Sequence, residues 1–336
     1  MNKFTKATSL ISEHYKGGIK INLSPACGYR SRCEFGYRNS FYTMYDRSGN
    51  IQYLEVFNIA RPAIQDLMPK LRNNINHSKF LNHKLFQVNF RTNSEDKILV
   101  TLIFHRKLND EMKEEAQKIS NQFKININLR SKKDIYSTGD ELLVDDININ
   151  NIMLYQTDQS FYQPNHFHMP EMVKKTLSYI YEPEDLLELY CGSGTFTLPL
   201  SYKFNNVFAT ENNRQSIKCL KKSIDKLSIN NINFARLSAE EVSEAFNGRV
   251  FRRMNKNNIN TYKFSHVLVD PPRSGLNDEV IEIIKKFKNI IYVSCNYETY
   301  IRDIKKLNKF YLKHIEIYDQ FPNTKHLEIV SLLSKL

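Results

Sequence analysis

The chain has 336 residues, enough for two domains that each bury a core. Its 41% apolar and 25% charged residues are typical of a soluble globular protein, and its net charge of +12 favours anionic partners. The opening residues Met1 to Lys6 contain no apolar core of signal-peptide length, and no later run could span a membrane, so we expect a cytoplasmic protein. The five cysteines are scattered, which predicts reduced thiols and no metal site.

The positive charge is concentrated in the first part of the chain. Residues 1–140 hold 23 Lys and Arg against 13 Asp and Glu, whereas residues 141–336 hold 25 against 23. This asymmetry predicts that the front part faces a polyanion. The alternative is a soluble domain that happens to be basic.

Residues 1–150 predict a basic α+β domain with an antiparallel sheet. In residues 29–35 apolar or small side chains alternate with Arg30, Arg32 and Glu34, the period of a half-buried strand. Arginines interleaved with Tyr and Phe can contact phosphates and stack on bases, as recognition of single-stranded RNA requires, although aromatic strands more often pack a core. The other expected elements are a hairpin of 41–45 and 53–57 around the turn Asp46–Gly49, a strand pair at 86–90 and 98–104, and helices at 61–74 and 109–123.

Residues 151–336 predict an α/β domain of Rossmann-like type. The apolar strand 185–190 runs into Cys191-Gly-Ser-Gly194, where two glycines let the backbone turn sharply and approach a ligand. The next strand, 206–211, ends in Glu211, at the position where such folds hold a ribose, although a solvated Glu at a strand end is the alternative. Helix 213–227 should bury Cys219 in the core. The remaining strands are expected at 234–241, 266–272, 290–295, 313–318 and 327–333.

Two of these strands end in chemically capable side chains. The apolar run 290–293 delivers Ser294-Cys295-Asn296, and the run 266–269 delivers Asp270-Pro-Pro-Arg-Ser-Gly275. Parallel strands place both sets at the edge of the sheet where α/β folds bind ligands. Taken alone, Cys295 fits better as a small buried hydrophobe, the usual place of a free cysteine.

Together the motifs resemble those of the RNA uracil-5-methyltransferases, which depend on S-adenosylmethionine. The basic first domain and His83-Lys-Leu-Phe-Gln87 resemble the tRNA branch of that family. The resemblance spans almost the whole chain. It rests on Phe161-x-Gln163-Pro-Asn165, Leu187–Gly194, Asp270–Gly275, Ser294–Asn296 and Asp319-Gln-Phe-Pro322, in this order.

The resemblance implies methylation of carbon 5 of the T-loop uridine, position 54, in tRNA, and of the equivalent uridine in transfer-messenger RNA. It implies that the Cys295 thiolate adds to carbon 6 of uracil and makes carbon 5 nucleophilic, and that Glu328 then removes the carbon 5 proton. The protein would act as a monomer and without metal, and it would flip its target base out of the folded loop.

By the same resemblance, five residues would line the cofactor site: Gln163, Tyr190, Thr195, Glu211 and Asp270. Four would contact RNA: Phe86 and His105 at the splayed loop, and Arg30 and Arg32 at phosphates. The chain departs from the family at three places, with Thr195 where Asn is frequent, Tyr297 where Pro is common and Gly36 where a basic residue is frequent.

Two alternatives remain open at this point. The first is a ribosomal RNA uracil-5-methyltransferase, although such relatives commonly carry a cysteine cluster or an additional N-terminal barrel. The second is a non-catalytic RNA-binding protein or RNA chaperone on the same scaffold.

Overall fold

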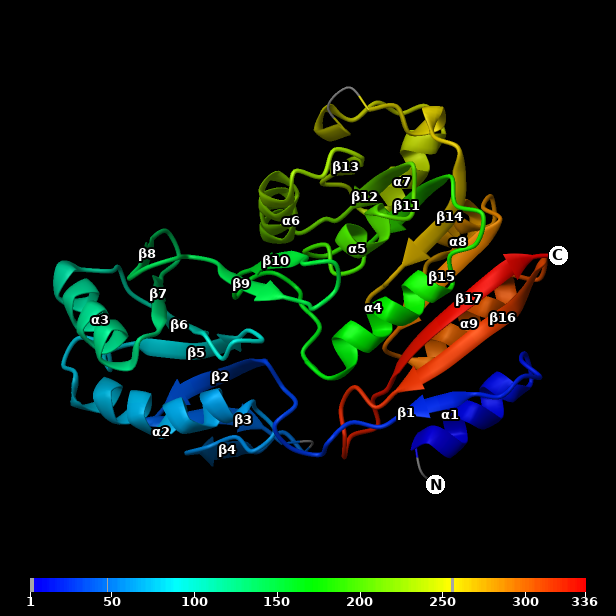
Figure 1. Cartoon of the computed structure of the whole chain (residues 1–336). Helices are drawn as coiled ribbons and strands as arrows, with labels where there is room; N and C mark the ends of the chain where they lie inside the picture. Colours follow the sequence, from blue (N-terminus) through cyan, green and yellow to red (C-terminus); the bar gives the residue numbers. More distant parts are fainter. Residues whose placement is uncertain (1–2, 47, 255–256) are drawn as a thin grey trace. The chain divides into compact units, whose positions relative to one another are not determined.

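The computed structural model describes residues 3–46, 48–254 and 257–336, and the chain divides into two compact units. The front unit comprises Pro25–Asp146 and Tyr155–Asp158. The back unit comprises Met1–Ser24, Ile147–Leu154 and Gln159–Leu336. Each unit is built on its own large sheet (Figure 1).

The sheet of the back unit has eight strands in the order β1-β16-β17-β15-β14-β11-β12-β13. Five neighbouring strands are parallel: β13 (Ile232–Ala235), β12 (Asn206–Thr210), β11 (Asp185–Leu189), β14 (Phe264–Val269) and β15 (Asn289–Ser294). Strand β17 (Glu328–Lys335) runs antiparallel to both β15 and β16 (Phe310–Tyr318), and β1 (Lys20–Asn22) pairs parallel with β16. The predicted strands at 185–190, 206–211, 266–272, 290–295, 313–318 and 327–333 correspond to β11, β12, β14, β15, β16 and β17. The strand predicted at 234–241 is wrong in its bounds, because β13 ends at Ala235 and Ser238 caps α7 (Ala239–Phe246), which takes residues 239–241 into a helix.

Helices cover both faces of this sheet, so the back unit is a three-layer α/β/α structure of Rossmann-like type (Figure 1). One face packs against α1 (Lys3–Ser12), α7 (Ala239–Phe246), α8 (Asp278–Ile284) and α9 (Tyr297–Lys306). The other packs against α4 (His168–Ser178), α5 (Thr197–Ser201) and α6 (Arg214–Leu227). Two short 3-10 helices, η1 (Arg252–Met254) and η2 (Ile259–Thr261), precede β14.

Asparagine side chains start several helices of this unit immediately after strands or loops. Asn213 accepts from the amides of Gln215 and Ser216 to cap α6, and Asn277 and Asn296 cap α8 and α9 in the same way. Such caps satisfy amide groups that the first helical turn leaves without partners. They hold each helix start close to the strand edge where the candidate site lies. Cys219 is fully buried on α6, as predicted.

The front unit contains a seven-stranded sheet in the order β4-β3-β2-β5-β6-β7-β8. The sheet is antiparallel as predicted except between β6 and β7, which are parallel because helix α3 (Asp110–Phe123) carries the chain across the sheet between them. Two helices pack on one face, α2 (Pro62–His77) and α3 (Asp110–Phe123). The strands are β2 (Arg32–Arg38), β3 (Phe41–Tyr45), β4 (Ile51–Leu54), β5 (Leu85–Thr92), β6 (Ile98–Phe104), β7 (Asn126–Arg130) and β8 (Ile135–Ser137).

The expected alternation along the first strand is confirmed. Cys33 and Phe35 are buried against the helices, whereas Arg32 and Glu34 face the other side of the sheet. Strands β3 and β4 form the expected hairpin, but β4 spans Ile51–Leu54 and not the predicted 53–57. Arg47, in the predicted turn, lies outside the described residues.

The unit boundaries differ from a simple division at residue 150. Helix α1 and strand β1 belong to the back unit, because Lys20 pairs with Glu316 and because Ala7 and Ile11 are buried in its core. Strands β9 (Leu143–Asp146) and β10 (Met153–Gln156) lie where the chain passes between the units. Among the described helices, none is both long and apolar enough to cross a bilayer.

Candidate active site

The register of the central sheet brings Cys295 and Glu328 opposite each other. Strands β15 and β17 pair antiparallel, and their last aligned pair is Ser294 with Ile329. One residue further along the ladder, Cys295 therefore lies across from Glu328, and directly opposed residues point to the same face of a sheet. Glu328 is 3% exposed, whereas Cys295 is half-buried. A thiol that a substrate can reach thus has a buried carboxyl group beside it.

Two further carboxyl groups project from the same face of the sheet. Leu186 and Leu268 are buried in the core on the α4, α5 and α6 side. Because strand residues alternate, Glu188 and Asp270 point to that side as well. Asp270 follows the last residue of β14, and Glu188 is the penultimate residue of β11.

Asn296 ties the cysteine to the loop that follows Asp270. Its side-chain oxygen accepts from the Glu298 amide at 3.0 Å and so begins α9. Its side-chain nitrogen donates to the Arg273 carbonyl at 3.1 Å, and the Thr299 hydroxyl donates to the same carbonyl at 3.3 Å. Tyr297, where relatives commonly have Pro, is simply the first residue of α9, and the cap forms without a proline.

The turn Cys191–Gly194 after β11 brings a backbone amide close to Glu211, which follows β12. The Glu211 carboxylate accepts from the Gly192 amide at 3.1 Å and from the Asn213 amide at 2.7 Å. Gly194 has φ of +94°, and a Cβ there would lie 2.6 Å from a methyl group of Leu220. This position therefore admits only glycine without distortion.

The predicted cofactor residues lie around the loop Cys191–Gly194. Gln163 donates to Asp270 at 3.4 Å and accepts from Gln320 at 2.7 Å. Thr195 is buried in the loop, and Tyr190 is half-buried with φ of +63°, an unusual conformation for a side chain of its size. The structure thus brings Gln163, Tyr190, Thr195, Glu211 and Asp270 to the same strand edge as Cys295.

Burial dominates the electrostatics of the carboxyl groups. It raises the pKa of Asp270 to about 7, with the Glu211 charge as the second cause. It raises the pKa of Glu188 to about 8, and the nearby Thr197 hydroxyl offsets part of this effect. It also raises the pKa of Glu328 well above its usual range, and Asp270 adds to the shift.

The same surroundings act on the thiol. Burial, followed by the Glu328 and Asp270 carboxylates, raises the pKa of Cys295 to about 12. The Arg273 guanidinium acts in the opposite direction on both Cys295 and Glu328. The site is therefore deficient in positive charge and suited to a cationic ligand.

In the front unit the predicted RNA residues fall into two pairs. Phe86 is 43% exposed and its ring stacks on His105 with centroids 4.1 Å apart and planes 18° apart. Arg32 donates to Glu34 at 2.8 Å, and Arg30 donates to the Arg32 carbonyl at 2.7 Å. The aromatic pair is thus presented to solvent, whereas both arginines have partners within the unit.

Three further residues around Asp270 and the thiol were not among the predicted site residues: Glu188, which interacts with Asp270, Gln320, which donates to Gln163, and Arg273, which acts on Cys295. Glu188 could have been found, because an acid inside an otherwise apolar parallel strand is costly to bury. Neither of its carboxyl oxygens has a hydrogen-bond partner among the described residues. Arg273 and Gln320 lie within recognised motifs, but only the folded chain shows what they face.

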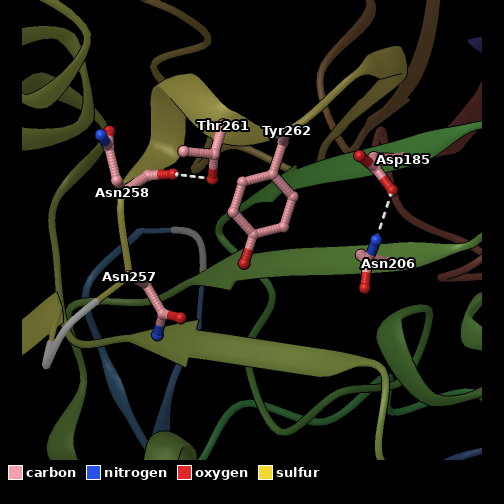
Figure 2. A pocket seen from close by; sticks show the side chains of 6 residues that line it. All are labelled: Asp185, Asn206, Asn257, Asn258, Thr261 and Tyr262. Atoms are coloured by element: carbon pink, nitrogen blue, oxygen red, sulfur yellow. Dashed lines mark hydrogen bonds between the residues drawn. The ribbon is translucent and has the colours of Figure 1, made fainter.

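A separate cavity of about 330 Å³ lies at the opposite edge of the sheet, where β11 and β12 begin. Figure 2 shows Asp185 joined to Asn206, and Asn258 joined to Thr261. Asp185 accepts from Asn206 at 2.9 Å and from the Lys263 amide at 2.7 Å, so its charge is already partnered. Across the described ranges, no three His, Cys, Asp or Glu side chains are grouped to hold a metal ion.

Comparison with known proteins supports an assignment at the level of family. Residues 1–336 match the family described as tRNA (Uracil-5-)-methyltransferase. The tRNA/tmRNA (uracil-C(5))-methyltransferase of Acinetobacter baumannii (strain AYE) is 36% identical over 354 residues, covering 99% of this chain and 97% of that protein. That of Saccharophagus degradans is 36% identical over 340 residues, covering 96% and 92%.

A solved structure shares the fold. It is the Pyrococcus abyssi tRNA (uracil-54, C5)-methyltransferase in complex with S-adenosyl-L-homocysteine, which is 21% identical, with a TM-score of 0.77 over 98% of this chain and 82% of that one. With the family match over the whole length and relatives at 36% identity, this chain belongs to the tRNA (uracil-5-)-methyltransferase family.

Proposed function

We propose that this protein uses S-adenosylmethionine to methylate carbon 5 of the uridine at position 54 in the T-loop of tRNA, and the equivalent uridine of transfer-messenger RNA. The observation that carries the proposal is the register that sets the Cys295 thiol opposite the Glu328 carboxyl group in a chain of this family. The relatives' names and the uracil-54 enzyme of the same fold support the substrate. We further propose that the protein is a monomer and acts in the cytoplasm, where tRNA is found.

The residues around the loop Cys191–Gly194 fit S-adenosylmethionine. Glu211, held by two backbone amides, leaves lone pairs for ribose hydroxyls, and the backbone at Gly192 and Gly194 allows close approach of a ligand. The raised pKa values of Asp270 and Glu328 mark a site that gains from a positive charge such as a sulfonium. Gln163, Tyr190 and Thr195 would complete the contacts. When bound, the cofactor supplies an electrophilic methyl group.

Cys295 and Glu328 then act in sequence on the base. The Cys295 sulfur forms a bond to carbon 6, the ring electrons move onto the carbonyl oxygen, and carbon 5 becomes the nucleophile. After carbon 5 carries the methyl group, Glu328 takes its proton. The electron pair of that C–H bond restores the double bond between carbons 5 and 6, and the sulfur leaves as a thiolate.

Burial of Cys295 opposes formation of its thiolate in the free protein. Addition requires a thiolate, yet burial raises the pKa of Cys295 to about 12. Arg273 is placed to favour the thiolate, and a cation arriving in the pocket would act in the same direction. We therefore expect the thiol to react slowly with alkylating reagents in the free protein.

The front unit supplies the RNA contacts in this proposal. The Phe86–His105 stack offers an aromatic platform for a base of the opened loop. Arg30 and Arg32 would contact phosphates by exchanging their present partners. Charge reversal at both arginines should weaken hairpin binding and reduce the dependence of its affinity on salt.

The test is methylation with labelled S-adenosylmethionine of a T-arm hairpin and, in parallel, a ribosomal RNA fragment. We expect label on carbon 5 of the T-loop uridine, lost in Cys295→Ala and retained in Cys27→Ala, which removes an exposed thiol from the front unit. Label on the ribosomal fragment alone would assign the protein to ribosomal RNA. Tight hairpin binding without label would favour an RNA-binding or chaperone role.

A further inference from the structure

The N-terminal helix holds the loop that leads into Glu328. Lys3, the first residue of α1, forms an ion pair with Asp319, and both side chains are only 11% exposed. Its ammonium group also donates to the carbonyls of Phe321 and His326, at 3.0 Å each. One buried cation therefore contacts both the beginning and the end of the loop 319–327.

That loop connects two elements of the candidate site. It joins β16 to β17, where Tyr318 pairs with Glu328, so Glu328 is the first residue beyond it. Within the loop, Gln320 donates to Gln163 at 2.7 Å, and its carbonyl accepts from Asn165 at 3.2 Å. The loop is thus bonded to a proposed cofactor residue and leads directly into the proposed base.

An ammonium group suits this position because it has three hydrogens and no acceptor, and here it meets one carboxylate and two carbonyls. Without the ammonium group between them, the carbonyl oxygens of Phe321 and His326 would repel each other. A buried charge also prefers one geometry, because moving it away leaves Asp319 unpaired. Replacement by an apolar residue would let the loop relax without removing the helix.

We propose that Lys3 is a positioning residue for the reaction: its ammonium group clamps the 319–327 loop and so fixes the Glu328 carboxyl group opposite Cys295. This inference rests on the proposed function, in which Glu328 removes the carbon 5 proton. Lys3 touches neither substrate nor cofactor in this role. Its loss should therefore slow the elimination step and spare the addition of Cys295 to the base.

That asymmetry separates positioning from simple docking of α1. If the base is misplaced, the bond between Cys295 and carbon 6 forms and carbon 5 is methylated, but the sulfur leaves slowly. A covalent protein–RNA complex then accumulates and survives denaturation. If Lys3 only docks the helix, addition and elimination decline together and no complex builds up.

The experiment compares Lys3→Met, Lys3→Arg and Glu328→Gln, each with T-arm hairpin and S-adenosylmethionine, by turnover kinetics and by gel detection of the covalent complex. The matched control is Lys6→Ala on the same helix, which removes an exposed pair with Glu298 at 2.9 Å. We expect Lys3→Met to lower kcat roughly 10- to 100-fold with little change in KM, and to accumulate complex as Glu328→Gln does. Lys3→Arg should recover part of kcat, and Lys6→Ala should match the wild type.

Loss of activity in Lys3→Met without accumulation of complex, or the same loss in Lys6→Ala, would overturn the inference. Circular dichroism of each variant shows whether it is folded, and Asp319→Asn, which keeps the acceptor but removes the charge, should reproduce the phenotype more weakly if Lys3→Met does not fold. Failure of Glu328→Gln itself to accumulate complex would refute the assignment of the base, a distinct result that is visible without any Lys3 variant.

Discussion

Replacing Asp270 by asparagine removes a negative charge at the end of β14 and keeps the shape of the side chain. Burial, and then the Glu211 carboxylate, raises the pKa of Asp270 to about 7, whereas an aspartate in an unfolded chain titrates near about 3.9. The native protein therefore holds this proton more tightly than the unfolded chain does. The stability that the protonated group contributes is complete below about pH 4 and is lost as the pH rises through about 7.

The size of the effect follows from the shift. Roughly three pKa units correspond to about 4 kcal/mol, of which about 2.5 kcal/mol falls between pH 5 and pH 8. Because the side chain is half-buried, water screens part of this penalty, and we expect about 1–2 kcal/mol. Relative to the wild type, Asp270→Asn should therefore be more stable at pH 8 than at pH 5 by that amount.

The assay is urea denaturation of the ligand-free proteins at both pH values, followed by circular dichroism with one fitted transition per unit. The control is Asp278→Asn, because hydrogen bonding to Lys306 lowers the pKa of that exposed carboxylate and it titrates below this range. A difference between Asp270→Asn and the wild type that stays constant, or shrinks, from pH 5 to pH 8 would refute the reasoning.

Three other variants probe separate parts of the structure. Asp303→Ala should lower the free energy of unfolding by about 3 kcal/mol in urea denaturation, because the buried Tyr292 hydroxyl, now 2.7 Å from the carboxylate, loses its acceptor. Gly194→Ala should weaken S-adenosylmethionine binding in calorimetry by about tenfold or more, since φ of +94° and the contact with Leu220 both oppose a Cβ; unchanged affinity would contradict the role of this loop. Phe86→Ala should cost about 1–3 kcal/mol in hairpin affinity with an unaltered salt slope, and a changed slope would indicate phosphate contact instead.

Local pattern was enough to predict most of the fold. A parallel strand buried on both faces needs a largely apolar run, so the segments 185–189, apart from Asp185 and Glu188, and 290–293 are sufficient to indicate strands. Alternation at 32–35 predicted which side chains of β2 face the helices. Polar residues directly after the strands, such as Asp270 and Cys295, predicted a site at one sheet edge, because parallel strands all end there.

Long-range pairing was beyond such patterns. Nothing local predicts that β17 inserts between β15 and β16, yet that register is what sets Glu328 opposite Cys295. Nor does periodicity predict the parallel pairing of β6 and β7.

Most of the central strands, their order and the chemical groups available at the strand ends could be predicted from the residues, because they depend on neighbours in the chain. What those groups face depends instead on the folded arrangement. Lys3 and Asp319 are 316 residues apart in the sequence and come into contact only in the folded chain. Glu188 is shielded from water only when the helices pack over the sheet. Burial, strand register and neighbouring charges all depend on residues that are distant in the sequence. The pKa values of the site groups are therefore set only when the chain is folded.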